Sequence, residues 1–270
     1  DDDGPGPSPL AAHFRDLHHR HEVLVLPNAW DAASAHIQAR AGAKAVATSS
    51  AALCWALGYQ DGGALPLGEL MSAIRRIVRT LAVPLTVDIE DGYSDNPDEV
   101  AELAAEIVQC GAVGINIEDG TAPSEILAEK IQAIRSRTGA AELFINARTD
   151  VYLKALVPAE DRVAETLKRA ALYQAAGADG LFVAGVTGAY EIEAICKGTA
   201  LPVNVLGFAC LPSPEELQAL GVRRLSAGSG IAEFLYGAMG GLVKSFLASG
   251  KLDTHDLKAF TYGEVNGLLK

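Results

Sequence analysis

The sequence predicts an α/β domain folded as a (β/α)8 barrel, and two patterns favour this fold class. Eight short apolar runs recur along the chain, separated by segments in which apolar residues have helical spacing. Several helical segments end in glycine just before the next run, as in "CGAVGI", "AAGADGLF" and "ALGVRRL", which is the stop signal expected before a parallel strand. Strict alternation of eight strands with helices favours a closed barrel over an open sheet.

The predicted strands, in chain order, are VLVLPN (23–28), AVATSS (45–50), PLTVDIE (84–90), GINIED (114–119), LFINART (143–149), GLFVAG (180–185), PVNVL (202–206) and RRLSAG (223–228). Helical spacing between them is clearest in two series of apolar residues: Leu70, Ile74, Ile77, Val78 and Leu81, and Val163, Leu167, Ala170, Ala171 and Ala175.

The domain organisation predicted from 270 residues is one barrel, a normal length for this fold. No Pro- or Ser-rich linker divides the chain, so we expect a single domain over 11–270, preceded by a flexible leader over 1–10 that is rich in Pro and Gly. The last part, "KLDTHDLKAFTYGEVNGLLK", predicts an additional C-terminal helical segment. Its apolar surface favours exchange onto a neighbouring subunit, and capping of its own barrel remains an equal alternative.

Charge and cysteine content limit the partners. The net charge of -12, from 22 basic and 34 acidic residues, argues against nucleic acid or an anionic membrane and leaves small molecules and metal ions. The four cysteines are widely spaced without a CxxC pair, which favours a reducing cytoplasm. The N-terminus does not resemble a signal peptide. We expect no membrane span, because Glu233, Lys244 and several glycines interrupt the most apolar stretch.

Charged residues occur where three predicted strands end. In "PLTVDIEDGY", positions 88 and 90 of an extended chain share one face, so Asp88 and Glu90 point the same way. Glu118 ends the next strand, and "FINARTD" places Arg148 on the following one. Because barrel active sites lie at the carboxyl ends of the strands, we expect these side chains to meet in the mouth of the barrel.

Three carboxylates in a partly dry pocket repel one another unless a cation balances them, and hard oxygen ligands suit Mg2+ or Mn2+. The alternative is an acid cluster neutralised by Arg148 and water. A magnesium ion held by few carboxylates keeps positions open for an anionic oxyacid substrate. The "SSA" turn of Ser49, Ser50 and Ala51 offers hydroxyls and amide hydrogens to one carboxylate. Arg148 suits a second carboxylate or a phosphonate.

These residues and their order resemble the isocitrate lyase and phosphoenolpyruvate mutase superfamily, particularly its short bacterial members. The resemblance covers most of the chain through an ordered series of motifs: "PNAWDAASA", "ATSSAALCWALGYQDG", "PLTVDIEDGY", "GAVGINIEDG", "INARTD", "AAGADGLFVAG", "PVNVL" and "GVRRLSAG". It implies a barrel with a last helix exchanged in a homo-oligomer, a tetramer or dimer, and Mg2+-dependent chemistry next to an enolate.

The resemblance also implies residue roles by position. Asp88 and Glu90 correspond to the metal pair, with Glu90 replacing the more usual second Asp, and Glu118 to the acid that holds metal-bound water. Ser49, Ser50 and Ala51 match the turn that binds the substrate carboxylate. Asp61 falls where the mutases have an essential Asp, Arg148 matches the substrate-binding Arg, and Asn204 resembles a substrate contact of the lyases.

Departures from the family pattern bear on the reaction. The segment "EDGTAPSEILAEK" has no Cys or His, which the lyases carry on a loop here, and the short loop also lacks the Lys and Asn that mutases and phosphonopyruvate hydrolases place on it. We therefore expect a Mg2+-dependent lyase or decarboxylase that cleaves a carbon-carbon bond of an oxaloacetate-like, methylisocitrate-like or substituted malate-like acid. Phosphorus-carbon chemistry is the second hypothesis, and a non-catalytic protein that binds an oxyacid is the third. Cys54, a lone thiol near the pocket, is expected to be a small core residue.

Overall fold

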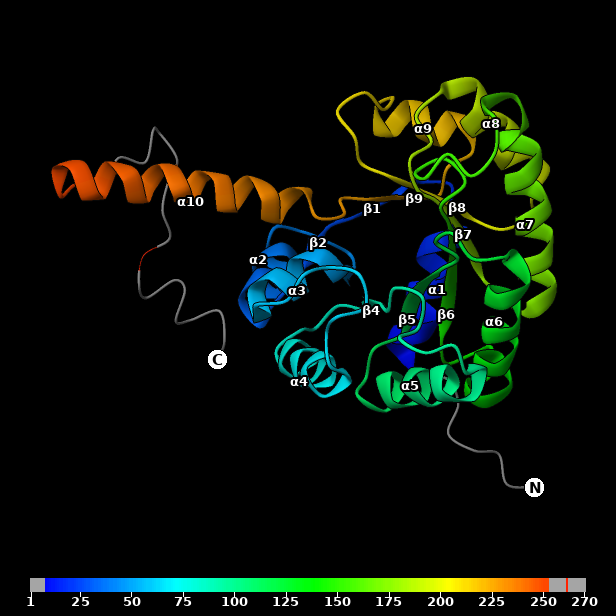
Figure 1. Cartoon of the computed structure of the whole chain (residues 1–270), viewed down its shortest axis with the longest axis horizontal. Helices are drawn as coiled ribbons and strands as arrows, with labels where there is room; N and C mark the ends of the chain where they lie inside the picture. The colour runs from blue at the N-terminus through cyan, green and yellow to red at the C-terminus, as the bar shows by residue number, and fades with distance from the viewer. Residues whose placement is uncertain (1–7, 253–260, 262–270) are drawn as a thin grey trace.

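The computed structural model describes residues 8–252 and 261, and its strands form one parallel sheet that curls into a nearly closed barrel (Figure 1). The strands follow the order β1-β9-β8-β7-β6-β5-β4-β3-β2. Their bounds are β1 Leu24–Leu26, β2 Asn28–Ala29, β3 Val46–Thr48, β4 Leu85–Asp88, β5 Gly114–Glu118, β6 Phe144–Thr149, β7 Gly180–Val183, β8 Val203–Leu206 and β9 Arg224–Ser226.

The predicted (β/α)8 barrel is confirmed, and Pro27 divides the first of its eight strands. β1 pairs with β9, with Leu24 opposite Arg224, whereas β2 pairs with β3. Proline has no N–H to donate to a sheet, but the carbonyl of Pro27 still accepts from the Ala47 N–H at 3.0 Å. The first strand thus closes the ring by pairing with a different neighbour on each side of Pro27.

Helices lie outside the sheet along most of its circumference (Figure 1). The helices of the described part are α1 Pro9–His19, α2 Ala32–Arg40, α3 Ser50–Leu57, α4 Leu67–Val78, α5 Pro97–Gln109, α6 Ser124–Thr138, α7 Arg162–Ala176, α8 Ala189–Gly198, α9 Pro214–Leu220 and α10 Gly230–Ser249, with a 3-10 turn at Ala159–Asp161. The first helix begins at Pro9, inside the segment expected to be a leader; residues 1–7 and most of the C-terminal segment 251–270 lie outside the described residues.

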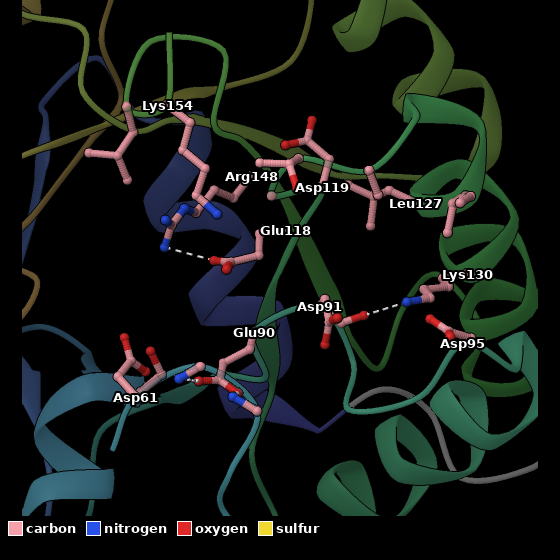
Figure 2. Close-up of a pocket in the computed structure, with 18 residues that line it drawn as sticks. Asp61, Glu90, Asp91, Asp95, Glu118, Asp119, Leu127, Lys130, Arg148 and Lys154 are labelled. Atoms are coloured by element: carbon pink, nitrogen blue, oxygen red, sulfur yellow. Dashed lines mark hydrogen bonds and ion pairs between the residues drawn. The ribbon is translucent and has the colours of Figure 1, made fainter. Parts of the chain in front are cut away.

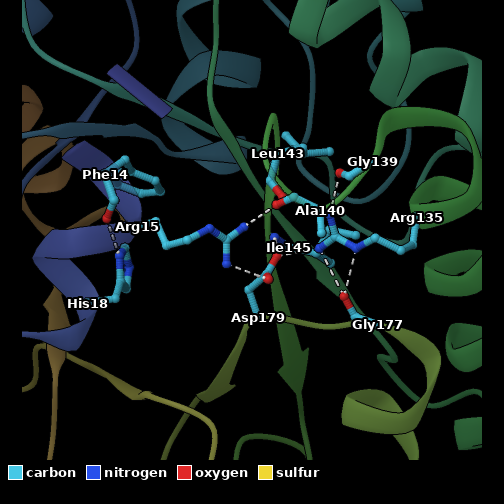
Figure 3. A network of polar contacts seen from close by, with 10 residues as sticks. All are labelled: Phe14, Arg15, His18, Arg135, Gly139, Ala140, Leu143, Ile145, Gly177 and Asp179. Atoms are coloured by element: carbon cyan, nitrogen blue, oxygen red, sulfur yellow. Dashed lines mark hydrogen bonds and ion pairs between the residues drawn. The ribbon is translucent and has the colours of Figure 1, made fainter. Parts of the chain in front are cut away.

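Helix α1 closes the amino-terminal end of the barrel. Phe14 is fully buried, and its ring meets that of Phe144, at the start of β6, edge-on at 5.6 Å. Arg15 and Arg135 both bind the carboxylate of Asp179, which also accepts from the Ile145 N–H (Figure 3). Asp179 thus connects α1 and α6 to the amino-terminal ends of the strands. This end of the barrel is closed, and the opposite end is open.

The interior of the barrel is polar near that opposite end. Successive strand residues alternate between the two faces, and the helix-facing positions are apolar, such as Val87 and Ile115, both fully buried. The inward positions include Asn116 and Asn146, whose side chains hydrogen-bond each other at 2.9 Å. A polar lining of this kind holds side chains in fixed orientations beneath the mouth.

Helix α10 extends away from the barrel (orange in Figure 1) and is mostly exposed. The expectation of no membrane-length apolar stretch is wrong by length and composition, since α10 has 20 residues and a mean hydropathy of 1.2 over its most apolar window. Its glycines do not break the helix. Length and composition alone are weak evidence for a membrane span, because core helices of soluble proteins can have the same length and hydropathy.

Candidate active site

Two adjoining cavities open at the carboxyl ends of the strands. The smaller, about 130 Å³, is lined by Asp88, Asn116 and the Ser49–Ala51 turn. The larger, about 520 Å³, is lined by Glu90 and Glu118 (Figure 2). Three residues line both cavities: Ser50, Asp61 and Arg148. The structure thus gathers the predicted acids, the Arg and the carboxylate turn in one mouth.

Asp88 ends β4 and is almost fully buried. Its Oδ1 accepts from the Glu90 N–H at 3.0 Å, and its Oδ2 accepts from Asn116 Nδ2 at 3.4 Å. Burial raises the pKa of Asp88, and the nearby guanidinium of Arg148 opposes that shift. Each carboxylate oxygen has two lone pairs, so these contacts leave acceptor capacity on both.

Glu90 does not lie on the strand face of Asp88, which corrects the prediction. β4 ends at Asp88, and Glu90 has φ +53°, a left-handed conformation, in a turn where the Gly92 N–H donates to the Ile89 carbonyl at 2.8 Å. The turn directs its carboxylate toward the N–H groups of Gly62 and Gly63, at 3.0 and 2.8 Å. Glu90 therefore reaches the mouth through a loop, not by strand alternation.

Glu118 and Arg148 form an ion pair across adjacent strands. Glu118 ends β5 and faces Arg148 on β6 in the sheet register, with Arg148 NH1 2.8 Å from its Oε2. The Asp150 carboxylate accepts two further hydrogen bonds from the guanidinium, from Nε at 2.8 Å and from Nη2 at 3.2 Å. Burial would lower the pKa of Arg148, but Glu118 and Asp150 outweigh burial and raise it. Arg148 is therefore a permanent cation, and three of its five N–H donors are engaged by Glu118 and Asp150.

Two acids of the larger cavity, Glu90 and Glu118, have raised pKa values. Burial raises the pKa of Glu118 to about 8, although Arg148 opposes this. Burial, followed by a hydrogen bond with Asp61, raises the pKa of Glu90 to about 7. Carboxyls with such pKa values lack sufficient positive charge nearby. A divalent cation would supply it.

The tightest cluster of metal-ligand atoms in the described residues differs from the predicted set. Ligand atoms of Cys54, Asp61 and Glu90 lie within 4.8 Å of one another, whereas Asp88 and Glu118 do not join them. Glu118 is drawn toward Arg148 and Glu90 toward the two glycine N–H groups. Burial raises the pKa of Cys54 to about 11, so this thiol is neutral and a poor ligand for a hard cation.

The Ser49–Ala51 turn forms the start of α3. Ser49 caps this helix, its Oγ accepting from the Ala52 N–H at 3.2 Å. The first N–H groups of a helix have no partner within it, so those of Ser50 and Ala51 remain for an anion in the smaller cavity. These residues therefore lie where a substrate carboxylate would need them.

Asn204 lies deeper than the other predicted substrate contacts. It is 1% exposed and lines neither cavity; the cavity wall on β8 is Leu206. Its Oδ1 accepts from Ser226 Oγ at 3.2 Å, and its Nδ2 has no partner among the described residues. A direct substrate contact by Asn204 remains a prediction.

Two residues near the mouth, Asp119 and Lys154, were missed by the sequence reasoning. Asp150, expected on the same strand face as Arg148, accepts two hydrogen bonds from it. Asp119 is buried and accepts from the Asp150 N–H, from Arg169 at 2.8 Å and from the Tyr173 hydroxyl at 2.6 Å. Lys154 lines the larger cavity. The sequence "ED" at the end of β5 placed Asp119 next to the predicted site residue Glu118. The role of Asp119 could not be predicted, because its partners on α7 are far away in sequence.

Comparison with known proteins identifies the family. A model of the phosphoenolpyruvate phosphomutase family matches residues 14–247. The chain belongs to this family and is thus a lyase or mutase of the isocitrate lyase and phosphoenolpyruvate mutase superfamily.

Relatives show how far the likeness extends. An uncharacterised protein of Mycobacterium tuberculosis is 38% identical over 80% of this chain and 81% of its own length. The oxaloacetate decarboxylase of Bradyrhizobium diazoefficiens is 34% identical over 60% of this chain and 57% of its own. A crystal structure of a proposed phosphonomutase from Burkholderia cenocepacia superposes with a TM-score of 0.83 at 40% identity, covering 88% of this chain and 100% of that one.

Proposed function

We propose that the protein is a Mg2+-dependent lyase or decarboxylase, with Mn2+ as an alternative ion, that cleaves a carbon-carbon bond of a 2-oxo or 2-hydroxy di- or tricarboxylate. Oxaloacetate-like, methylisocitrate-like and substituted malate-like acids are the candidate substrates. The observation that carries the proposal is the mouth itself, where acids with raised pKa values adjoin the N-terminus of α3 and Arg148. The relative named oxaloacetate decarboxylase supports this substrate class.

The metal would be held by Asp88, Glu90 and Glu118, with Asp61 beside Glu90. Mg2+ commonly uses one or two protein carboxylates and completes its coordination shell with water and substrate oxygens. The site therefore suits Mg2+ even though the three carboxylates do not all meet at one point. When bound, such an ion withdraws electron density from the 2-oxo and carboxylate oxygens of the substrate, which lowers the energy of the enolate.

Protein groups would bind both ends of the substrate. The free N–H groups of Ser50 and Ala51 bind the carboxylate next to the 2-oxo group, assisted by the Ser49 and Ser50 side chains. Arg148 orients a second anionic group by releasing part of its pairing with Glu118. Asp61, which lines both cavities, accepts or donates a proton near the reacting carbons.

Phosphorus-carbon bond chemistry is the second candidate, as in a phosphoenolpyruvate or carboxyphosphonoenolpyruvate mutase or a phosphonopyruvate hydrolase. The structure at 40% identity that is named a phosphonomutase favours it. The missing Lys and Asn in the segment after β5 argue against it.

The test is an assay of the purified protein with Mg2+ against oxaloacetate, methylisocitrate and phosphonopyruvate. We expect pyruvate from an organic acid and none from phosphonopyruvate. Pyruvate from phosphonopyruvate alone would establish the second candidate. Tight oxalate binding in a thermal-shift titration, with no turnover of any acid, would overturn both.

We further propose that the protein works as a homo-oligomer, a tetramer or dimer, in the cytoplasm. The exposed apolar side chains of α10 support association, and the four free cysteines support a reducing compartment. Exchange of α10 between subunits would cover that surface.

A further inference from the structure

The proposed reaction forms an enolate, which must receive a proton to give the product. The turn after β5 has no Cys, His or Lys that could donate this proton, since residues 119–123 read "DGTAP" before α6 begins. Among the described residues that line the larger cavity, two lysines are amines that could donate, Lys130 and Lys154. Lys130 is 3% exposed, and its Nζ donates to the Asp91 carbonyl at 2.8 Å. That leaves Lys154.

The backbone under Lys154 is fixed by close packing against the end of β7. The Leu153 N–H donates to the Ala184 carbonyl at 3.1 Å, and the Lys154 N–H donates to the Asp150 carbonyl at 2.9 Å. Gly185 has φ +90°, and a Cβ there would lie 2.8 Å from Leu153 Cα. The glycine lets the turn after β6 press onto β7, and this places Lys154 at the rim.

The side chain of Lys154 extends toward Arg148 and Glu118 at the rim of the mouth (Figure 2). Its Nζ is 3.5 Å from Asp150 Oδ2, and a Cβ added to Gly120 would also lie 3.5 Å from Nζ. Asp150 is already bound more closely by Arg148, at 2.8 Å. With its side chain 42% exposed, Lys154 therefore has donor capacity free for a ligand in the cavity beside Glu118.

We propose that Lys154 is a catalytic residue that delivers the proton to the enolate carbon of the product. The inference rests on the proposed function. In the decarboxylation of an oxaloacetate-like acid, the carbon-carbon bond breaks, its electron pair remains on the carbon next to the 2-oxo group, and the other fragment leaves as CO2. The N–H bond of Lys154 then breaks as the new C–H bond forms, and the neutral amine regains a proton from solvent. Lysine ammonium groups carry this proton at neutral pH.

The test compares Lys154→Gln, which removes charge and proton, with Lys154→Arg, which keeps the charge but holds its proton too tightly to donate. Lys197→Gln, at an exposed lysine on α8, is the matched control. We expect both Lys154 variants to lose about 100-fold in kcat, within the usual range for a general acid, with little change in KM. In deuterium oxide, we expect the wild type to exchange the methyl protons of pyruvate and both Lys154 variants to lose this exchange.

A labelling experiment tests the position of Lys154 without turnover. Mg2+ with oxalate should slow reductive methylation of Lys154 but not of Lys197, measured by peptide mass spectrometry. Unchanged labelling of Lys154, or near wild-type kcat in Lys154→Arg, would overturn the proton-donor role alone. A wild-type protein that cleaves none of the candidate acids would overturn the proposed function instead.

Discussion

Asp88 is the acid whose removal should weaken metal binding most directly, because it lies at the end of β4 and lines the smaller cavity beside the carboxylate turn. We expect Asp88→Asn to weaken Mn2+ binding by about 100-fold or more, since loss of an outer-shell partner already costs about 10 to 100-fold. Isothermal titration with Mn2+ measures this. Asp98→Asn, at an exposed acid on α5, is the control; equal affinities in the two variants would remove Asp88 from the metal site.

Glu118 and Glu90 give the metal-free protein a characteristic pH dependence. Their pKa values, about 8 and about 7, exceed the ordinary 4.5, so the folded state binds more protons than the unfolded state between these limits. Stability should therefore fall as pH rises from about 5 to 8. The check is a set of denaturant titrations across that range, and a stability that rises with pH would contradict the burial of these acids.

Metal binding should show the opposite trend. Each proton displaced from Glu90 or Glu118 by the ion makes apparent affinity rise by about tenfold per pH unit below the pKa of that group. Mn2+ titrations at several pH values measure the slope. A flat profile would mean that the ion binds without displacing these protons.

Asp119 should matter for stability more than for chemistry. Its carboxylate joins the start of the turn after β6 to Arg169 and Tyr173 on α7. Asp119→Ala removes one of the two carboxylates that pair with Arg169, the other being Glu165. It also leaves the Asp150 N–H and the Tyr173 hydroxyl without their acceptor, so we expect a loss of about 3 kcal/mol. Tyr173→Phe removes one hydrogen bond and should cost about 1 kcal/mol. Urea unfolding measures both, and a smaller loss in Asp119→Ala than in Tyr173→Phe would refute this ranking.

At the scale of whole elements, α10 is the helix that its own barrel leaves uncovered. Its exposed side chains include Phe234, Met239 and Phe246, and its described ring contact with the barrel is Tyr236 with Trp55. An apolar groove of about 620 Å³ between β1, the end of α2 and the start of α10 also lies open. Such surfaces mark sites of association.

Polar replacement on α10 should therefore change the assembly. We expect light scattering to report an oligomer for the wild type and smaller species for Met239→Glu combined with Phe246→Glu. Arg20→Glu, at the exposed residue that follows α1, is a control of similar charge change. A monomeric wild type would contradict the proposed exchange of this helix.

Elements were easier to predict than their ends. All eight strand segments were found from apolar runs and glycine stops, because these patterns are local. The turn at Glu90 was not, since a left-handed Glu depends on the N–H groups of Gly62 and Gly63, which no short-range pattern connects to it. Likewise, nothing local indicates that Arg148 pairs with Glu118 and Asp150 together.

For the whole molecule, the sequence predicted the class of site better than its chemistry. The barrel brings its strand ends together whichever loops connect them to the helices, so Asp88, Glu118 and Arg148 could be assigned to one mouth in advance. Lys154 could not, because its position depends on Gly185 and the end of β7. Asn204 shows the converse: an inward strand position can lie too deep to line a cavity.

The pairing of β1 with β9 has a consequence for synthesis in the cell. Leu24 leaves the ribosome 200 residues before Arg224, the residue opposite it on the neighbouring strand. Contacts so distant along the chain form slowly, because the entropy of closing the intervening loop must be overcome first. The nascent barrel must therefore wait with one unpaired edge, and this interval is when chaperones would be needed most.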